Sequence, residues 1–205
     1  PDLELIDYLE AVPRLDSLSD VPEGTAVAVR GDVDAKPGAQ IGEGDIRLRS
    51  MVDTLSYGRQ RGWKQVVFGH IGRKPEGSLD KVAARLGELL ECDVPLLTDW
   101  LDEESMTIST KVAEQIAAAQ PGAVLVLENT RRYDVERALW KATSADLPQL
   151  SERLSRFANE FAEKIARVYI HEALSAGSMD ASSTIVPVAM DRVAMGQYEA
   201  SEFDG

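Results

Sequence analysis

The chain has 205 residues, of which 22 are basic and 35 are acidic, so its formal net charge is −13. This net charge argues against nucleic acid as a general partner, because phosphate binding needs a basic face, and the 44% hydrophobic share is that of a folded protein rather than a disordered one. A single cysteine excludes an internal disulfide framework, and no apolar stretch is long enough to cross a membrane. We therefore expect one folded domain over residues 1–205, located in the cytoplasm, with neither nucleic acid nor membrane as a partner.

The first half of the chain alternates short apolar runs with amphipathic segments. Residues 26–33 are dense in valine and predict a buried strand. Residues 46–62 carry apolar side chains at helical spacing and end in a glycine, which predicts one helix with a glycine C-cap. Residues 65–70 predict the next strand, and residues 78–91 predict an amphipathic helix that begins with an N-cap serine.

The same alternation continues to the end of the chain. Residues 94–100 predict a short strand, residues 109–119 a helix, and residues 123–129 the clearest buried strand. A long amphipathic helix at 146–166 precedes a strand at 167–173. Strands separated by helices are joined by crossovers and lie parallel. The predicted fold class is therefore α/β, with a single doubly wound, mostly parallel, Rossmann-like sheet of about five or six strands and helices on both faces.

Charged side chains follow the predicted strands, at the edge where an open parallel sheet binds its ligands. In chain order they are Arg30, Asp32 and Asp34; His70, Arg73 and Lys74; Glu128, Asn129, Arg131 and Arg132; and His171 and Glu172. Arg47, at the start of the first long helix, is expected to reach the same edge. Because guanidinium groups bind carboxylate and phosphate through paired hydrogen bonds, this cluster predicts a receptor for a small phosphorylated acid.

Each of these residues also has a plainer interpretation. An arginine after a strand often lies in solvent or pairs with a nearby carboxylate, and a lone histidine such as His70 is as often structural. Asp32 and Asp34 resemble half of a metal site, but no third ligand follows at a telling spacing, so no metal is expected. The chain has neither a P-loop nor a G-x-G-x-x-G motif.

Five stretches resemble, in order and spacing, the N-terminal domain of phosphoglycerate kinase. They are VAVRGDVDAKPG, IRLRSMVDTL, VVFGHIGRKPEGSLDKVAARLGELL, VLVLENTRRYDVE and VYIHEAL. The family patterns that they resemble are VRVDFNVP, a helix opening R-I-R, SHLGRP, LLENVRF and a strand ending NDAFGTAHRAHAS. The resemblance runs from about residue 26 to the end of the chain.

The resemblance implies a substrate site and a mechanism. In that family the N-terminal domain holds 3-phosphoglycerate, a second domain holds the magnesium nucleotide, and hinge closure brings the two together for phosphoryl transfer. It implies that six residues surround the substrate, namely Asp32, Asp34, Arg47, His70, Arg73 and Arg131. Among them, Arg47 takes the catalytic position, the arginines neutralise and align the acid, His70 hydrogen-bonds it, and Asp32 holds a hydroxyl.

The chain also departs from the family pattern. Asp34 stands at an asparagine position, Met179 stands where an arginine would meet the phosphate, and His171 with Glu172 replaces an asparagine–aspartate pair. No cofactor is expected in this chain, because Mg-ATP or Mg-ADP would need the second domain, and the isolated chain is expected to lack kinase activity. Two other hypotheses stay open: a stand-alone, non-catalytic relative that binds another small anion or a protein partner, and a separate chain that supplies the nucleotide-binding lobe.

Overall fold

The computed structural model describes residues 11–174 and 178–204, and at its centre lies a parallel sheet of six strands. The order across this sheet is β3-β6-β2-β1-β7-β8, and every neighbouring pair is parallel. The strands are β1 (Ala26–Gly31), β2 (Lys64–Phe68), β3 (Leu96–Leu97), β6 (Val124–Leu127), β7 (Val168–Glu172) and β8 (Arg192–Met195). Successive strands are added on one side of β1 and then on the other, so the predicted doubly wound fold is confirmed.

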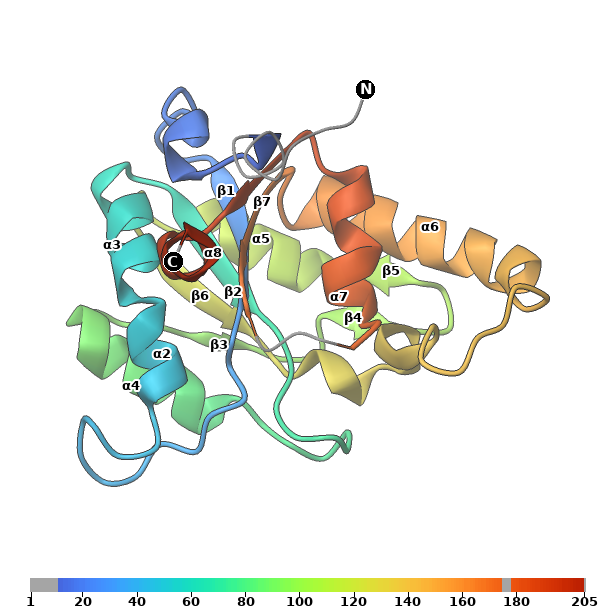
Figure 1. The fold of residues 1–205 in the computed structure, drawn as a ribbon, viewed down its shortest axis with the longest axis horizontal. Helices are drawn as coiled ribbons and strands as arrows, with labels where there is room; N and C mark the ends of the chain where they lie inside the picture. The colour runs from blue at the N-terminus through green and yellow to red at the C-terminus, as the bar shows by residue number, and fades with distance from the viewer. Residues whose placement is uncertain (1–10, 175–177, 205) are drawn as a thin grey trace.

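Helices cover both faces of the sheet (Figure 1). The cover of one face is η1 (Leu15–Leu18), α2 (Ile46–Ser50), α3 (Val52–Gln60) and α4 (Asp80–Leu90). The cover of the other face is α5 (Thr110–Ala118), α6 (Leu147–Lys164), α7 (Ala181–Thr184) and η4 (Val186–Ala189). The final helix, α8 (Gln197–Asp204), buries none of its side chains and lies beside α3 and the end of β7.

The valine-rich runs form strands because both faces of each strand are buried. In β1, Val27 and Val29 pack into the core beneath α2, α3 and α4, while Ala28 packs into the core beneath α5 and α6. The neighbouring β2 follows the same alternation, with Val67 on the first side and Phe68 on the second. Removal of this apolar surface from water on both sides favours a continuous hydrophobic strand.

Residues 46–62 form two helices, so the prediction of one helix is wrong. The N–H of Met51 bonds back to the carbonyl of Leu48, three residues earlier, and this tight turn separates α2 from α3. Met51 is fully buried, and its sulfur lies against the backbone of Gly31, where a side chain would clash. The predicted glycine C-cap is present, because Gly62 follows α3 with a left-handed φ of 69°.

Three further features differ from the predicted elements. Helix α4 begins at Asp80, and the hydroxyl of Ser78 accepts the Asp80 N–H at 3.2 Å without being the N-cap residue. Strand β8 and a small antiparallel hairpin of β4 (Leu101–Asp102) and β5 (Thr107–Ile108) were not predicted.

No helix in the described part of the chain is both long enough and apolar enough to cross a membrane.

Candidate functional site

The carboxyl ends of β6, β2, β1 and β7 lie at one edge of the sheet, where the predicted site residues follow them. β1 leads into Asp32, β2 leads into His70, and the 3-10 helix η2 (Thr130–Arg132) after β6 carries Arg131. The structure does not gather all the predicted residues around one cavity. It places four of them in two groups, one buried and one exposed, and leaves Asp34 and Arg73 on the loops beside them.

The buried group surrounds the carboxylate of Asp180, which is 0% exposed and was not among the predicted site residues. Its Oδ2 atom lies 3.1 Å from Nδ1 of His70, 3.2 Å from Nη2 of Arg131 and 3.8 Å from Nη2 of Arg30. Its Oδ1 atom accepts a hydrogen bond from Nε1 of Trp140 at 2.8 Å. Two arginines, a histidine and an indole N–H therefore converge on one carboxylate.

The local backbone explains this convergence. Asp180 is the N-cap residue of α7, and its carbonyl oxygen accepts the N–H groups of Ser183 and Thr184, while its side chain makes no cap bond and turns inward. On the opposite side, the amide oxygen of Asn129 accepts the N–H of Ile71 at 3.2 Å and the N–H of Arg131 at 3.1 Å. Asn129 thus ties the loop after β2 to the loop after β6 and fixes the base of Arg131.

A second buried carboxylate, Glu136, lies next to this group in η3 (Asp134–Arg137). It accepts the backbone N–H of Ser182 at 2.9 Å and the hydroxyl of Thr130 at 3.0 Å. The hydroxyl of Ser182 donates to Glu136 and accepts a hydrogen bond from Nε of Arg30. Burial raises the pKa of Glu136, and the opposing charge of Arg30 limits that rise.

The electrostatics of Asp180 go in the opposite direction. Burial alone would raise its pKa, but the hydrogen bond with His70 and the positive charge of Arg131 hold the pKa of Asp180 well below its usual range. The carboxylate is therefore ionised at neutral pH and supplies the negative charge at the centre of the group.

Ligand atoms of His70, Glu136 and Asp180 lie within 4.8 Å of one another, a spacing that a metal ion could bridge. The charges of the surrounding side chains oppose such an ion, because Nη2 of Arg131 already contacts Asp180 at 3.2 Å and Nη2 of Arg30 lies 3.1 Å from His70. A cation placed between them would meet two guanidinium groups at close range. The two guanidinium groups therefore disfavour a metal ion between these three side chains.

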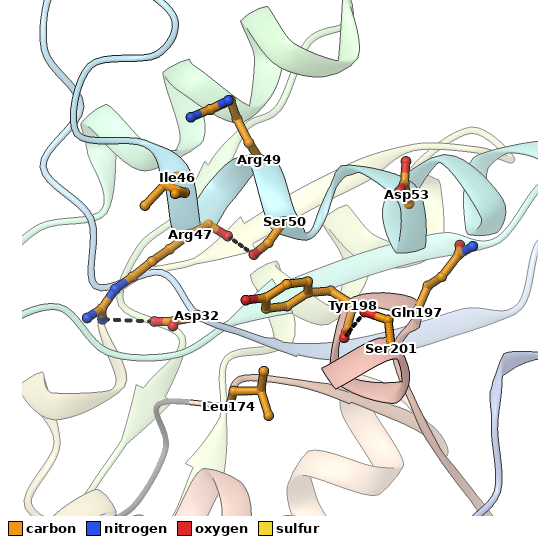
Figure 2. Close-up of a pocket in the computed structure, with 10 residues that line it drawn as sticks. All are labelled: Asp32, Ile46, Arg47, Arg49, Ser50, Asp53, Leu174, Gln197, Tyr198 and Ser201. Atoms are coloured by element: carbon orange, nitrogen blue, oxygen red, sulfur yellow. Dashed lines mark hydrogen bonds and ion pairs between the residues drawn. The ribbon is translucent and has the colours of Figure 1, made fainter. Parts of the chain in front are cut away.

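The exposed group lies beside a cavity of about 840 Å³ between α2 and α8 (Figure 2). Nη1 of Arg47 pairs with Oδ1 of Asp32 at 3.1 Å, and the Arg47 side chain is 43% exposed. Figure 2 shows Arg47 reaching toward Asp32 on one side, with Tyr198 and Gln197 of α8 on the other. The lining residues are Asp32, Ile46, Arg47, Arg49, Ser50, Asp53, Leu174, Gln197, Tyr198 and Ser201.

The α8 wall of this cavity is held by polar contacts to the end of β7. The buried carboxylate of Glu172 accepts the N–H of Tyr198 and the hydroxyl of Thr54, each at 2.9 Å. Next to it, Nδ1 of His171 lies 2.9 Å from a carboxylate oxygen of Glu199. The two residues therefore anchor α8 and do not contact the buried group around Asp180 in the described structure.

The two other predicted residues lie on loops. Oδ1 of Asp34 accepts the N–H of Gly72 at 3.0 Å, and the carbonyl of Gly72 accepts a hydrogen bond from Nη1 of Arg131 at 2.5 Å. Arg73 is exposed, and its side chain has no ion-pair or hydrogen-bond partner within residues 11–174 and 178–204. Asp34 thus positions the loop that supports Arg131, while Arg73 is an unpaired cation at the rim.

Reasoning from the sequence missed Asp180 and Trp140. The signal for Asp180 is in the sequence, because an aspartate directly follows Met179, the residue that stands at the family's arginine position. Met179 is 55% exposed and does not enter the buried group, and residues 175–177 lie outside the described chain. Trp140 carried no motif, and only the tertiary structure brings it to the cluster.

The family model and the similar proteins all point to one family. The family model described as phosphoglycerate kinase matches residues 18–204. A cytosolic phosphoglycerate kinase of Triticum aestivum is 30% identical over 168 residues, which are 79% of this chain and 36% of that protein. A phosphoglycerate kinase of Clavibacter michiganensis is 39% identical over 134 residues, which are 62% of this chain and 30% of that protein.

Solved structures support the same fold. The crystal structure of phosphoglycerate kinase from Pyrococcus horikoshii superposes with a TM-score of 0.69 at 21% identity, over 93% of this chain and 44% of that chain. The phosphoglycerate kinase from Coxiella burnetii gives a TM-score of 0.63 at 19% identity, over 91% of this chain and 43% of that chain. The chain therefore spans less than half the length of each of these proteins.

Proposed function

The chain belongs to the phosphoglycerate kinase family, and we propose that it is the part of such a kinase that binds a small phosphorylated acid, with 3-phosphoglycerate as the substrate. The observation that carries this proposal is the arrangement of cations at the carboxyl edge of the sheet. Arg47 in α2, His70 in the loop after β2 and Arg131 in η2 follow three different strands, and Arg73 lies unpaired on the rim beside them within the described structure. Such an edge suits an acid with two anionic ends.

The proposed roles follow from the position of each side chain. The cavity beside Arg47 has room for the body of a three-carbon acid, and Arg47 is half-exposed, so it can exchange Asp32 for a substrate carboxylate. Asp32 is then free to accept a hydrogen bond from a substrate hydroxyl. Asp34 acts indirectly, because it holds the loop at Gly72 rather than facing the cavity.

The proposed reaction is phosphoryl transfer between the substrate carboxylate and a magnesium nucleotide. In this reaction the protein positions the reactants and neutralises charge, without a nucleophile of its own. Arg47, as the catalytic arginine, would stabilise the charge that develops on the transferred group. The nucleotide with its magnesium would be held by a second lobe or a partner chain, and we propose the cytoplasm, the compartment named for the wheat relative, as the location.

Calorimetric titration of the wild-type chain with 3-phosphoglycerate tests this proposal. We expect micromolar-to-millimolar binding, and a loss of about tenfold or more in affinity for Arg47→Ala, because one charge-assisted contact is removed. Arg167→Ala is the matched control, since Arg167 is 59% exposed, pairs with Asp191 and precedes β7 at the opposite edge of the sheet. It should bind like the wild type.

The absence of binding in every variant would refute the proposal. It would leave the hypothesis of a non-catalytic relative that binds another small anion or a protein. A coupled ATP-dependent assay gives an independent test, because the chain alone is expected to show no turnover above background. Turnover by the purified chain would contradict the need for a second lobe.

A further inference from the structure

The carboxylate of Asp180 occupies the position that a bound anion would take. We propose that Asp180 is a built-in competitor: its side chain fills an oxyanion site formed by Arg131, His70 and Trp140, and a tetrahedral oxyanion such as phosphate binds there only when this carboxylate is removed or displaced. The inference deepens the proposed function, because it concerns the same edge of the sheet, and it names the residue that limits affinity there.

The first argument is the nature of the donors around Asp180. Every hydrogen bond or ion pair to its carboxylate comes from a side chain: Arg131, His70, Trp140 and, at 3.8 Å, Arg30. No backbone N–H group in the described structure bonds to this carboxylate. A carboxylate held only by cationic and indole side chains has the surroundings of a ligand rather than those of a cap.

Another buried aspartate shows the contrast. Asp45 is also 0% exposed and pairs with Arg85 and Arg49. Both of its oxygens additionally accept the backbone N–H of Gly42, so Asp45 fastens the turn that precedes α2. Asp45 therefore has a structural role in the loop, whereas the loops around Asp180 are held by other groups, chiefly Asn129.

The second argument is that the carboxylate leaves a donor unused. The Arg131 side chain is 7% exposed, and its Nη atoms bond to Gly72, Ser178 and Asp180, while its buried Nε has no hydrogen-bond partner among the described residues. An unsatisfied buried donor is costly. The two oxygens of a carboxylate are already shared by several donors here. A tetrahedral oxyanion offers more acceptor oxygens and matches the fork of an arginine.

The third argument is access. The His70 side chain is 12% exposed and Ser178 is half-buried, so the group lies just beneath the surface at the rim of the sheet. Arg73 is exposed on the loop after β2, three residues beyond His70, where its positive charge would attract an incoming anion. The site is therefore occupied by the side chain of Asp180 but lies close to solvent.

Thermal unfolding and calorimetry with inorganic phosphate test the inference, at constant ionic strength with chloride as the reference anion. Asp180→Ala removes the carboxylate and its volume, so we expect it to bind phosphate about tenfold or more tightly than the wild type and to gain stability as phosphate is added. Asp20→Ala is the matched control, because Asp20 is an exposed carboxylate paired with Arg192, so the net charge changes equally. It should behave like the wild type.

Two further variants make the result decisive. The double variant Asp180→Ala with Arg131→Gln should lose the gain, since the receiving guanidinium is absent. If Asp180→Ala does not fold, Asp180→Asn removes the charge and keeps the shape, and it should still bind phosphate more tightly than the wild type. Equal phosphate affinity in the wild type and in the folded Asp180 variant would overturn the inference.

This outcome is separable from that of the proposed function. A gain of phosphate binding in Asp180→Ala supports the inference even where wild-type protein does not bind 3-phosphoglycerate. Conversely, 3-phosphoglycerate binding by the wild type, together with equal phosphate affinity in the wild type and in the folded Asp180 variant, supports the proposed function and refutes the role of Asp180.

Discussion

The two cation groups at the carboxyl edge contain similar side chains in different surroundings. Around Asp180, the arginines are buried and the central carboxylate is 0% exposed. Around Asp32, the partner Arg47 is 43% exposed and borders a cavity. A buried pair is hard to break, because the partner left behind loses its solvation, whereas an exposed pair contributes little and exchanges readily with solvent or ligand.

This difference indicates which group is available to a substrate. Arg47 can leave Asp32 at small cost, so the cavity between α2 and α8 is open to an acid without rearrangement of the core. Arg131 can accept a new anion only if Asp180 gives way. The same edge of the sheet thus has one half that is ready for a ligand and one half that is already occupied.

The largest expected effect comes from breaking the buried group. Asp180→Asn should lower the free energy of unfolding by about 3–5 kcal/mol, because it leaves buried guanidinium groups without their counter-charge. Urea denaturation measures this loss. Asp20→Asn, at an exposed arginine pair, is the control and should change stability by less than about 1 kcal/mol. A small effect at Asp180 would mean that the buried group contributes little to stability.

The pH dependence of the free energy of unfolding should also differ between the wild type and Asp180→Asn. The pKa of Asp180 is lower in the folded chain than in the unfolded one, so its ionised form stabilises the fold above the ordinary aspartate pKa of about 3.9. That stabilisation is lost as the pH falls below this value toward the lowered pKa. The stability difference between wild type and Asp180→Asn should therefore be constant near neutral pH and shrink in acid. A difference that stays constant down to acid unfolding would contradict this.

A smaller effect is expected where α8 forms the cavity wall. A Cβ atom on Gly196 would lie 1.6 Å from a carboxylate oxygen of Glu172, which accepts hydrogen bonds from the first turn of α8. Gly196→Ala should therefore displace α8 and lower the free energy of unfolding by about 1–3 kcal/mol. Chemical denaturation and the binding of 3-phosphoglycerate together measure the effect. Ala200→Gly is the comparison variant, because it weakens α8 by its lower helix propensity without placing an atom against Glu172.

The smallest effect on stability is expected at the exposed group. Arg47→Ala should change the free energy of unfolding by less than about 1 kcal/mol while weakening the binding of an acid. Arg73→Ala, which removes a cation with no partner in the described structure, should change stability even less. A loss of stability at Arg47 comparable to that at Asp180 would show that the two halves of the edge do not differ as the structure indicates.

The fold was predictable from the sequence because its strongest signals are local. The valine-rich runs at β1, β2 and β6 are buried on both faces, and this burial requires the continuous apolar pattern that identified them. β8 was missed because it is a short edge strand that begins with Arg192 and exposes Val193. The break at Met51 depends on its packing against Gly31 in a neighbouring element, which no local pattern reports.

The candidate site was predictable in its location but not in its pairing. Parallel strands bring their carboxyl ends to one edge, so the loops that carry Asp32, His70 and Arg131 could be placed together. Which carboxylate each cation meets depends on distant segments. Asp180 reaches Arg131 across 49 positions of sequence, and Trp140 reaches Asp180 across 40. The pairing of Asp180 with Arg131 and His70 therefore arises only in the tertiary structure and cannot be read from the local sequence.

The central claim is that this edge binds a phosphorylated acid, with Arg47 as a contact and Asp180 as a competitor. Calorimetric titration of 3-phosphoglycerate into the wild type, Arg47→Ala and Asp180→Asn tests it most directly. We expect measurable wild-type affinity that is weaker in Arg47→Ala and tighter in Asp180→Asn. Titrations without heat of binding in all three proteins, or with one affinity shared by all three, would contradict it.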